Sequence, residues 1–145
     1  MKSINIALLS IGRDTSIIFG FKKVFKNLKI NGKIIGLDAD SNAVGLHFSD
    51  IGLKVPLYTD KGYNKKLSSI IDDYNIDLII PTADHDLIWW EKNRNYFKKQ
   101  HNKFLFSDVD TINNTLFKKN FLNILIKENI PCPMIIHRGR IRLHS

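Results

Sequence analysis

Short apolar runs alternate with longer amphipathic stretches along most of the chain. Mostly apolar segments of strand length occur at 4–9, 33–38, 54–58, 77–81 and 103–106. A short run that is apolar at successive positions is typical of a strand covered on both faces, as in the middle of a parallel sheet. Pro56 places the third run at a sheet edge or a strand end, because proline cannot donate a ladder hydrogen bond.

The stretches between these runs have helical periodicity. In the first of them, residues 16–28, apolar side chains recur at the spacing of one helix face: Ile17, Phe21, Val24, Phe25 and Leu28. Further helices are predicted at 43–48, 63–74, 84–99 and 116–128. A short helix that ends at residue 112 is also predicted, with a capping residue among 107–110. Because parallel neighbours need crossover connections, this alternation predicts an α/β fold. We expect a Rossmann-like three-layer domain with a mostly parallel sheet of about five strands.

Length and composition bound the class of protein. The 145 residues suffice for one domain, which we expect to span residues 1–134, with a basic tail at 135–145 that reads as the truncated start of a next domain. No run reaches the roughly 20 apolar residues that span a bilayer, so no membrane association is expected. With Cys132 as the single cysteine an internal disulfide is excluded, which favours a cytoplasmic protein.

The net charge of +8 raises the question of a polyanionic partner. The lysines are dispersed along predicted helices, at 22, 23, 26 and 29, at 65 and 66, and at 98 and 99. Such dispersion is typical of solvated helix faces, so nucleic acid is not expected as a partner.

Candidate chemistry lies where predicted strands end, because ligands of parallel sheets bind beyond the carboxyl ends of the strands. In the loop 10–16, Gly12 permits close backbone approach, and Arg13 can contact a phosphate or carboxylate. The alternative is a plain turn capped by Thr15 or Ser16. The glycines of a G-x-G-x-x-G fingerprint are missing, which counts against an NAD(P)-linked oxidoreductase.

Acidic and hydroxyl side chains follow two further predicted strands. Asp38 is a candidate ligand-binding acceptor, whereas Asp40, or Ser41 beside it, can equally cap the next helix. Thr82 and Asp84 either orient a substrate or cap the helix that follows them.

Histidine and tryptophan residues at the start of the 84–99 helix give two further expectations. His85 and Asp86 are adjacent and point roughly 100° apart on a helix, so we expect a surface histidine and no catalytic dyad. Trp89 and Trp90 cannot both lie on one narrow stripe, so one is expected in the core and the other against a partner domain or subunit. A homodimer, or a stand-alone binding or assembly module, would fit that arrangement. No catalytic residue and no metal-ligand spacing is found.

Five segments in register with the predicted strand ends resemble the opening domain of ATP-grasp ligases, with the carbamoyl-phosphate synthase large-subunit-like group nearest. They are Ser-Ile-Gly-Arg at 10–13, Gly-Leu-Asp-Ala-Asp at 36–40, His-Phe-Ser-Asp at 47–50, Pro-Thr-Ala-Asp at 81–84 and Glu-Asn-Ile-Pro-Cys-Pro at 128–133. The resemblance covers about residues 3 to 134 and implies a pre-ATP-grasp, Rossmann-like domain. In this family ATP phosphorylates a carboxylate, an amine attacks the acyl phosphate, and the leading domain helps to position substrate.

The resemblance also implies roles for individual residues. A small-molecule carboxylate or amine substrate would contact the strand-end loops at Gly12, Arg13, Asp38, Asp40, Thr82 and Asp84. Lys118 matches a basic position near the nucleotide phosphates, although Phe117 stands where the family often has an acid. ATP and Mg are cofactors of the full-length family. The ATP clamp and the Mg-binding acids are absent here, so neither cofactor is expected to bind this chain tightly, and the chain alone is expected to be inactive.

Overall fold

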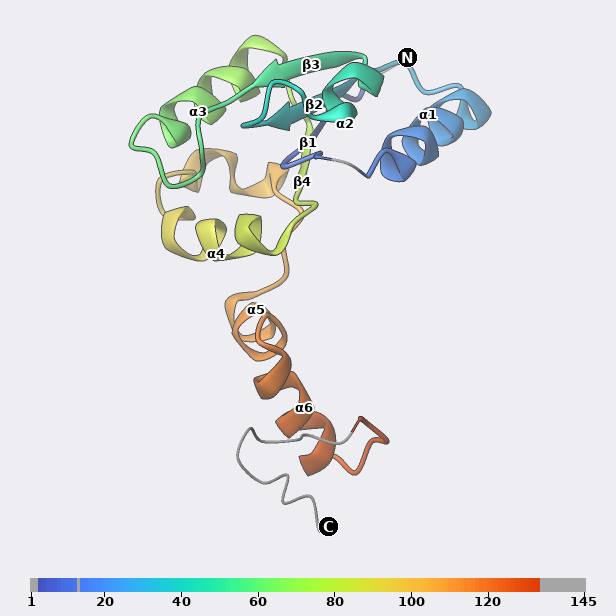
Figure 1. Cartoon of the computed structure of the whole chain (residues 1–145). Coiled ribbons are helices and arrows are strands. Elements are labelled where there is room, and N and C mark those ends of the chain that lie inside the picture. The colour runs from blue at the N-terminus through green and yellow to red at the C-terminus, as the bar shows by residue number, and fades with distance from the viewer. Residues whose placement is uncertain (1–2, 13, 134–145) are drawn as a thin grey trace, which may run out of the picture. The chain divides into compact units, whose positions relative to one another are not determined.

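The computed structural model describes residues 3–12 and 14–133 (Figure 1). The chain divides into two compact units, Met1–Phe106 and Ser107–Ser145, and each unit is described by itself. Among the described residues, none of the helices combines the length and the apolar character needed to cross a bilayer.

A parallel sheet forms the centre of the first unit. Its strands are β1 (Ile6–Leu8), β2 (Ile34–Asp38), β3 (Ile51–Lys54) and β4 (Leu78–Ile80), in the order β3-β2-β1-β4. Ala7 of β1 lies opposite Ile35 on one side and Ile79 on the other. The predicted α/β class and parallel sheet are confirmed.

The sheet has four strands in the described part of the chain, slightly below the predicted five. The run at 103–106 supplies only an isolated parallel bridge between Phe104 and Ile79. The strand predicted at 54–58 lies earlier, at 51–54, because the chain leaves the sheet just before Pro56, which has no N–H for the ladder.

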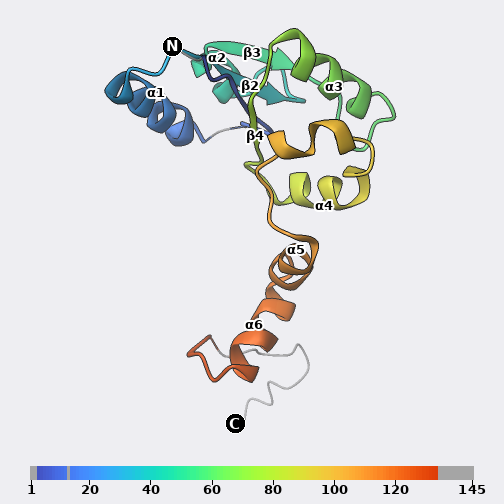
Figure 2. The same cartoon turned by 180° about the vertical axis from the view of Figure 1, so that it is seen from behind.

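Helices lie on both sides of the sheet, which gives the expected three layers (Figures 1 and 2). α1 (Ser16–Leu28) lies on one side, and α3 (Tyr63–Asp73) and α4 (Asp84–Asn93) lie on the other. The short α2 (Val44–Phe48) precedes β3. Buried side chains of α1, the sheet and the loop after β1 form one cluster: Ile6, Leu8, Ile11, Ile18, Ile34 and Ile80.

Both tryptophans are buried, so the expectation that one of them faces a partner is wrong. Trp89 is 2% and Trp90 4% exposed. The predicted helix 84–99 ends at Asn93, and after a 3₁₀ helix (Lys98–Lys103) the chain returns to α4. Trp90 stacks on Phe104 and Phe106, with ring centroids 4.3 and 4.8 Å away. The returning segment therefore covers a second face of α4.

The second unit contains α5 (Val109–Thr115) and α6 (Lys118–Lys127), which contact each other. The capping residue expected at 107–110 is Asp108, whose carboxylate accepts from the backbone N–H of Thr111 at 2.9 Å. The basic tail predicted at 135–145 lies outside the described residues.

Two helical glycines have opposite surroundings. A Cβ on Gly45 of α2 would lie 2.4 Å from the backbone oxygen of Ile11 and 2.6 Å from its Cγ1. The same atom on Gly20 of α1 would meet nothing within 4 Å. Gly45 therefore allows α2 to approach the loop after β1, where its N–H donates to the Gly12 oxygen at 3.1 Å.

We expect the same substitution to have opposite effects at these positions. Gly45→Ala should lower the free energy of unfolding by about 1–3 kcal/mol, because overpacking forces the loop or α2 to move. Gly20→Ala should raise it by roughly 0.5–1 kcal/mol, because alanine loses less backbone entropy in a helix. Urea denaturation measures both, and equal shifts in the two variants would contradict this account of Gly45.

Candidate functional site

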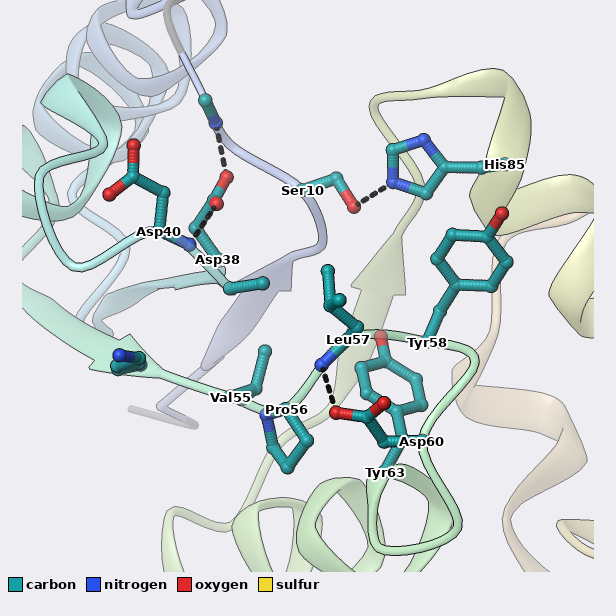
Figure 3. A pocket seen from close by; sticks show the side chains of 13 residues that line it. Ser10, Asp38, Asp40, Val55, Pro56, Leu57, Tyr58, Asp60, Tyr63 and His85 are labelled. Carbon is teal, nitrogen blue, oxygen red and sulfur yellow. Dashed lines mark hydrogen bonds between the residues drawn. The ribbon is translucent and has the colours of Figure 1, made fainter.

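A pocket of about 650 Å³ lies at the carboxyl edge of the sheet (Figure 3). Its lining comes from the loops after β1, β2 and β3, from the start of α3 and from the start of α4: Ser10, Gly12, Asp38, Ala39, Asp40, Lys54, Val55, Pro56, Leu57, Tyr58, Asp60, Tyr63 and His85. Ligands of parallel α/β folds bind at this edge, so the position agrees with the sequence prediction.

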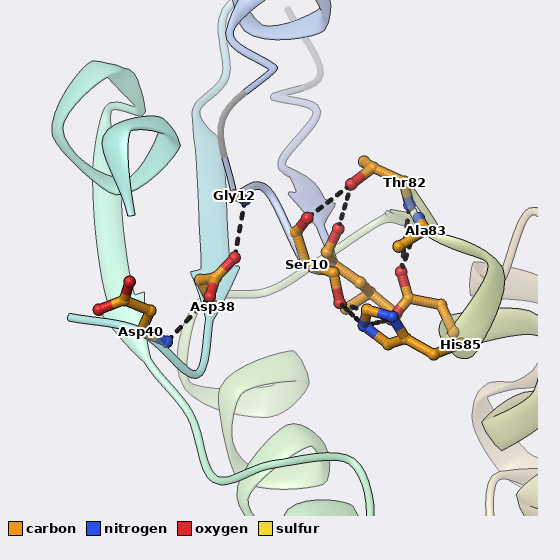
Figure 4. Close-up of polar contacts among 9 residues, drawn as sticks. Ser10, Gly12, Asp38, Asp40, Thr82, Ala83 and His85 are labelled. Atoms are coloured by element: carbon orange, nitrogen blue, oxygen red, sulfur yellow. Dashed lines mark hydrogen bonds and ion pairs between the residues drawn. The ribbon is translucent and has the colours of Figure 1, made fainter. Parts of the chain in front are cut away.

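Asp38 joins two of these loops (Figure 4). Its Oδ2 accepts from the backbone N–H of Gly12 at 2.7 Å, and its Oδ1 accepts from the N–H of Asp40 at 2.9 Å. Asp40 in turn accepts from the N–H of Asn42 at 2.8 Å. α2 has Ala43 as its N-cap residue and no side-chain cap, so the suggestion that Asp40 or Ser41 caps this helix is wrong. Asp40 instead closes the turn before it.

The loop after β1 is also held from the side of α4. The Ser10 hydroxyl donates to Oδ1 of Asp86 at 2.7 Å and lies 2.8 Å from Nε2 of His85. With the carboxylate ionised, the single hydroxyl proton is directed to Asp86, so Nε2 of His85 is the donor to Ser10. Ser10 adopts the left-handed backbone conformation, with φ 51°, and this pair of contacts holds it there.

Asp86 also caps α4. Its Oδ2 accepts from the backbone N–H groups of Thr82 and Ala83, both at 3.2 Å, whereas the N-cap residue Ala83 has no side-chain acceptor. The suggestion that Thr82 or Asp84 caps this helix is therefore wrong. The Thr82 hydroxyl instead points to the carbonyl oxygens of Leu9 and Ser10, each at 2.8 Å.

The electrostatics of Asp86 follow from its position. Its side chain is 1% exposed, and this burial, as the largest effect, raises the pKa of the carboxyl above 3.8. The hydrogen bond from Ser10, the nearby His85 and the N–H groups of Ala83 and Thr82 act in the opposite direction.

Aromatic and apolar side chains form the remaining walls of the pocket. The rings of Tyr58 and His85 stack with centroids 4.9 Å apart and an interplanar angle of 19°. Asp60 fixes the bend after β3, because its Oδ2 accepts from the N–H of Leu57 at 3.1 Å. Tyr63 rises from the first turn of α3 and packs edge-on against Trp89.

The predicted site residues are only partly brought together. Gly12, Asp38 and Asp40 line the pocket, whereas Thr82 holds the neighbouring loop and Asp84 is exposed outside the lining. Arg13 lies outside the described residues. Lys118 is the first residue of α6 in the second unit, and its contact with nucleotide phosphates stays a prediction.

Several pocket residues are not among the predicted site residues, such as Ser10, Tyr58 and Tyr63. The buried Asp86 behind the wall is considered from the sequence only as a partner of His85. Asp86 stands three residues after the N-cap position, which is the spacing of a capping box, but Ala83 at that position hides the pattern. Tyr63 could have been found, since it continues the apolar face of α3 formed by Leu67 and Ile70.

Metal binding has no support in this part of the chain. Among residues 3–12 and 14–133, no group of three or more His, Cys, Asp or Glu side chains is arranged to hold an ion.

Comparisons with known proteins place these observations in a family. Residues 6–105 match the family described as "PylC-like, N-terminal domain". No curated protein sequence matches the chain.

Solved structures share the fold. A biotin carboxylase domain of a single-chain bacterial carboxylase superposes with a TM-score of 0.56 at 10% identity, covering 96% of this chain and 32% of that one. The glycinamide-RNase-transformylase T structure from Mycobacterium tuberculosis gives 0.55 at 10% identity, covering 86% and 35%. Biotin carboxylase from Campylobacter jejuni, in a βγ-ATP complex, gives 0.56 at 17% identity, covering 90% and 29%.

These neighbours show the fold, and this chain spans about a third of the length of each. Together with the family match they confirm the resemblance to the leading domain of ATP-grasp enzymes.

Removal of the Asp86 carboxylate tests its role in holding the pocket wall. Asp86→Ala should lower the free energy of unfolding by about 2–4 kcal/mol, because the Ser10 hydroxyl and two backbone N–H groups lose their acceptor. Asp86→Asn should stay within about 1 kcal/mol of the wild type, since an amide oxygen can still accept from the N–H groups while its NH₂ donates to Ser10. The control is Asp84→Ala, which should cost less than about 1 kcal/mol. Equal losses for Asp84→Ala and Asp86→Ala in urea denaturation would contradict the assignment.

Acidification should stabilise the wild type relative to Asp86→Asn. Between its ordinary value of 3.8 and its raised pKa in the folded state, Asp86 binds protons more strongly in the native than in the unfolded chain. Its contribution to the free energy of unfolding therefore grows as the pH falls through the raised pKa and shrinks as the pH rises. Urea denaturation of both proteins from pH 7 to about pH 4.5 measures the difference between their free energies of unfolding at each pH. A difference that is constant, or that shrinks with acidification, would refute the raised pKa.

Proposed function

The chain belongs to the PylC-like N-terminal domain family, and from this membership we propose that it is the substrate-positioning leading domain of an ATP-dependent carboxylate–amine ligase. The observation that carries the proposal is the convergence of the loops after β1, β2 and β3 on one pocket at the carboxyl edge of the sheet. A small molecule in this pocket would contact side chains from several elements that are already fixed to one another.

The proposed role is one of orientation. A ligase of this kind joins an acyl phosphate and an amine, and holding one reactant in a fixed geometry can remove several kcal/mol from such a barrier, on the order of 7–11 kcal/mol in the best intramolecular cases. Rigid support of the binding groups is what such positioning requires. The contacts of Asp38 with Gly12 and of Asp86 with Ser10 supply that support on two sides of the loop after β1.

ATP and Mg belong, in this proposal, to the ligase as a whole. Lys118 is proposed as a contact to the nucleotide phosphates, because a cation there would neutralise charge during phosphoryl transfer. Arg13, Thr82 and Asp84 stay proposed substrate contacts. We further propose a cytoplasmic setting, as the single cysteine favours.

The alternatives have less support. A stand-alone assembly module was suggested by an exposed tryptophan, but Trp89 and Trp90 are both buried. Homodimer formation remains a separate prediction that does not depend on them. An NAD(P)-linked oxidoreductase would need a glycine-rich turn after β1, where Gly12 stands as the single glycine of the segment 9–16.

We expect the 145-residue chain alone to show no ATP-dependent ligation. Purified protein, incubated with Mg-ATP and mixtures of amines and carboxylates, should release no ADP above background in a coupled assay and form no amide product by mass spectrometry. The control is Asp38→Asn, because a contaminating ATPase would be equally active in both preparations. Amide formation that depends on ATP and is lost in Asp38→Asn would refute the proposal.

A further inference from the structure

We infer that the pocket at the carboxyl edge receives the amine substrate as its protonated ammonium, and not the carboxylate substrate or the phosphates of ATP. This inference rests on the proposed function and names the reactant that this domain would hold. Three observations carry it: the charge of the lining, the aromatic wall, and the hydroxyl of a buried tyrosine that opens on the pocket and has no hydrogen-bond partner among the described residues.

Carboxylates dominate the charged groups of the lining. Among the described lining residues, Asp38, Asp40 and Asp60 are opposed by Lys54 alone as a full positive charge. An anion placed between these groups would be repelled, whereas an ammonium would be attracted. The lining therefore favours a cation over an anion.

The carboxylates are fixed before any ligand arrives. Backbone N–H groups hold Asp38 at Gly12 and Asp40, Asp40 at Asn42, and Asp60 at Leu57. An ionised carboxylate has about four acceptor sites, so each of these groups keeps free acceptor capacity. Since their orientation is already set, binding a cation would order few additional side chains.

Tyr63 is the second and independent observation. The residue is 4% exposed, it lines the pocket, and its ring reaches from α3 toward Leu57 and Tyr58 (Figure 3). No group of the described residues hydrogen-bonds its hydroxyl, and that oxygen is not sealed off within the protein, so its open side is the pocket. A hydroxyl oxygen that opens on the pocket without a protein partner is free to accept, and an ammonium N–H would supply the donor.

The state of the Tyr63 hydroxyl suits this role. Burial is the largest effect that raises the pKa of Tyr63, and the charges of Asp86 and Asp38 raise it further. The group therefore stays a neutral phenol at physiological pH, which can accept a hydrogen bond from an ammonium.

The remaining walls fit the carbon skeleton of an amine. Val55, Pro56 and Leu57 present apolar surface, and the stacked rings of Tyr58 and His85 form an aromatic wall. An ammonium near the face of Tyr58 would gain a cation–π contribution. The volume of about 650 Å³ is in the range of pockets that hold small molecules.

A matched set of probes tests the inference by ¹⁵N–¹H NMR of the chain. The probes are 1,5-diaminopentane, glutarate and 1,5-pentanediol, which share a five-carbon skeleton and differ in charge, together with AMP as a nucleotide. We expect saturable shifts from 1,5-diaminopentane at the amides of Gly12, Asp40, Leu57 and His85. Glutarate, 1,5-pentanediol and AMP should produce no saturable shifts at these amides with an affinity comparable to that of the diamine.

Variants separate specific binding from general attraction of a dication. Tyr63→Phe removes only the hydroxyl and keeps the ring against Trp89; it should weaken diamine binding by about 2- to 10-fold. Asp40→Asn should weaken it by about 2- to 5-fold. Glu91→Gln is the matched control: it removes one carboxylate of α4 outside the lining, at a residue that is not a proposed substrate contact, and should leave the affinity unchanged.

The outcomes distinguish this inference from the proposed function. Shifts of the pocket amides by glutarate or AMP, with none by the diamine, would overturn the amine assignment and leave the substrate-positioning role standing. Equal weakening in Glu91→Gln and Asp40→Asn would show general charge attraction and would also overturn it. If no probe shifts the pocket amides, although the spectrum is that of a folded chain, both this inference and the proposed function would be overturned.

Discussion

The buried carboxylate of Asp86 is the contact on which the pocket depends. It holds the Ser10 hydroxyl and the backbone N–H groups that open α4, so the loop after β1 and the first turn of α4 share one acceptor group. From its other side the same loop is held by Asp38, through the N–H of Gly12. Two carboxylates thus hold this loop in addition to the backbone hydrogen bonds of Leu9 with Ile80 and of Ile11 with Leu37.

The fold was readable from the sequence wherever a local pattern agreed with the final packing. Central strands of a parallel sheet are buried on both faces, which makes β1, β2 and β4 continuous apolar runs. Carboxyl ends of parallel strands meet at one edge, so the proximity of Gly12 and Asp38 followed from their positions after two such runs. The outer strands of the sheet were harder to predict, because β3 ends before Pro56 and Phe104 pairs with Ile79 through a single bridge.

The rest depended on contacts between distant parts of the chain. One helix stripe cannot bury Trp89 and Trp90 together, and both are buried only because residues 97–106 return to α4. The contact of Asp86 with Ser10 requires knowing that β1 and β4 are neighbours, and its local role as a cap is hidden by Ala83 at the N-cap position. The same holds for His85, whose contact with Ser10 spans 75 positions of sequence.

The segment 55–58 has a further consequence for engineering. Its side chains form the apolar and aromatic walls of the pocket, but the carboxylate contacts that fix the loops after β1 and β2 do not involve them. The shape and apolar character of the pocket are therefore set by residues other than those that fix the two loops. Libraries randomised at Leu57, which is 55% exposed, and at Tyr58 can explore new specificities, whereas the buried Val55 and the two aspartates mark the positions that such a library leaves constant.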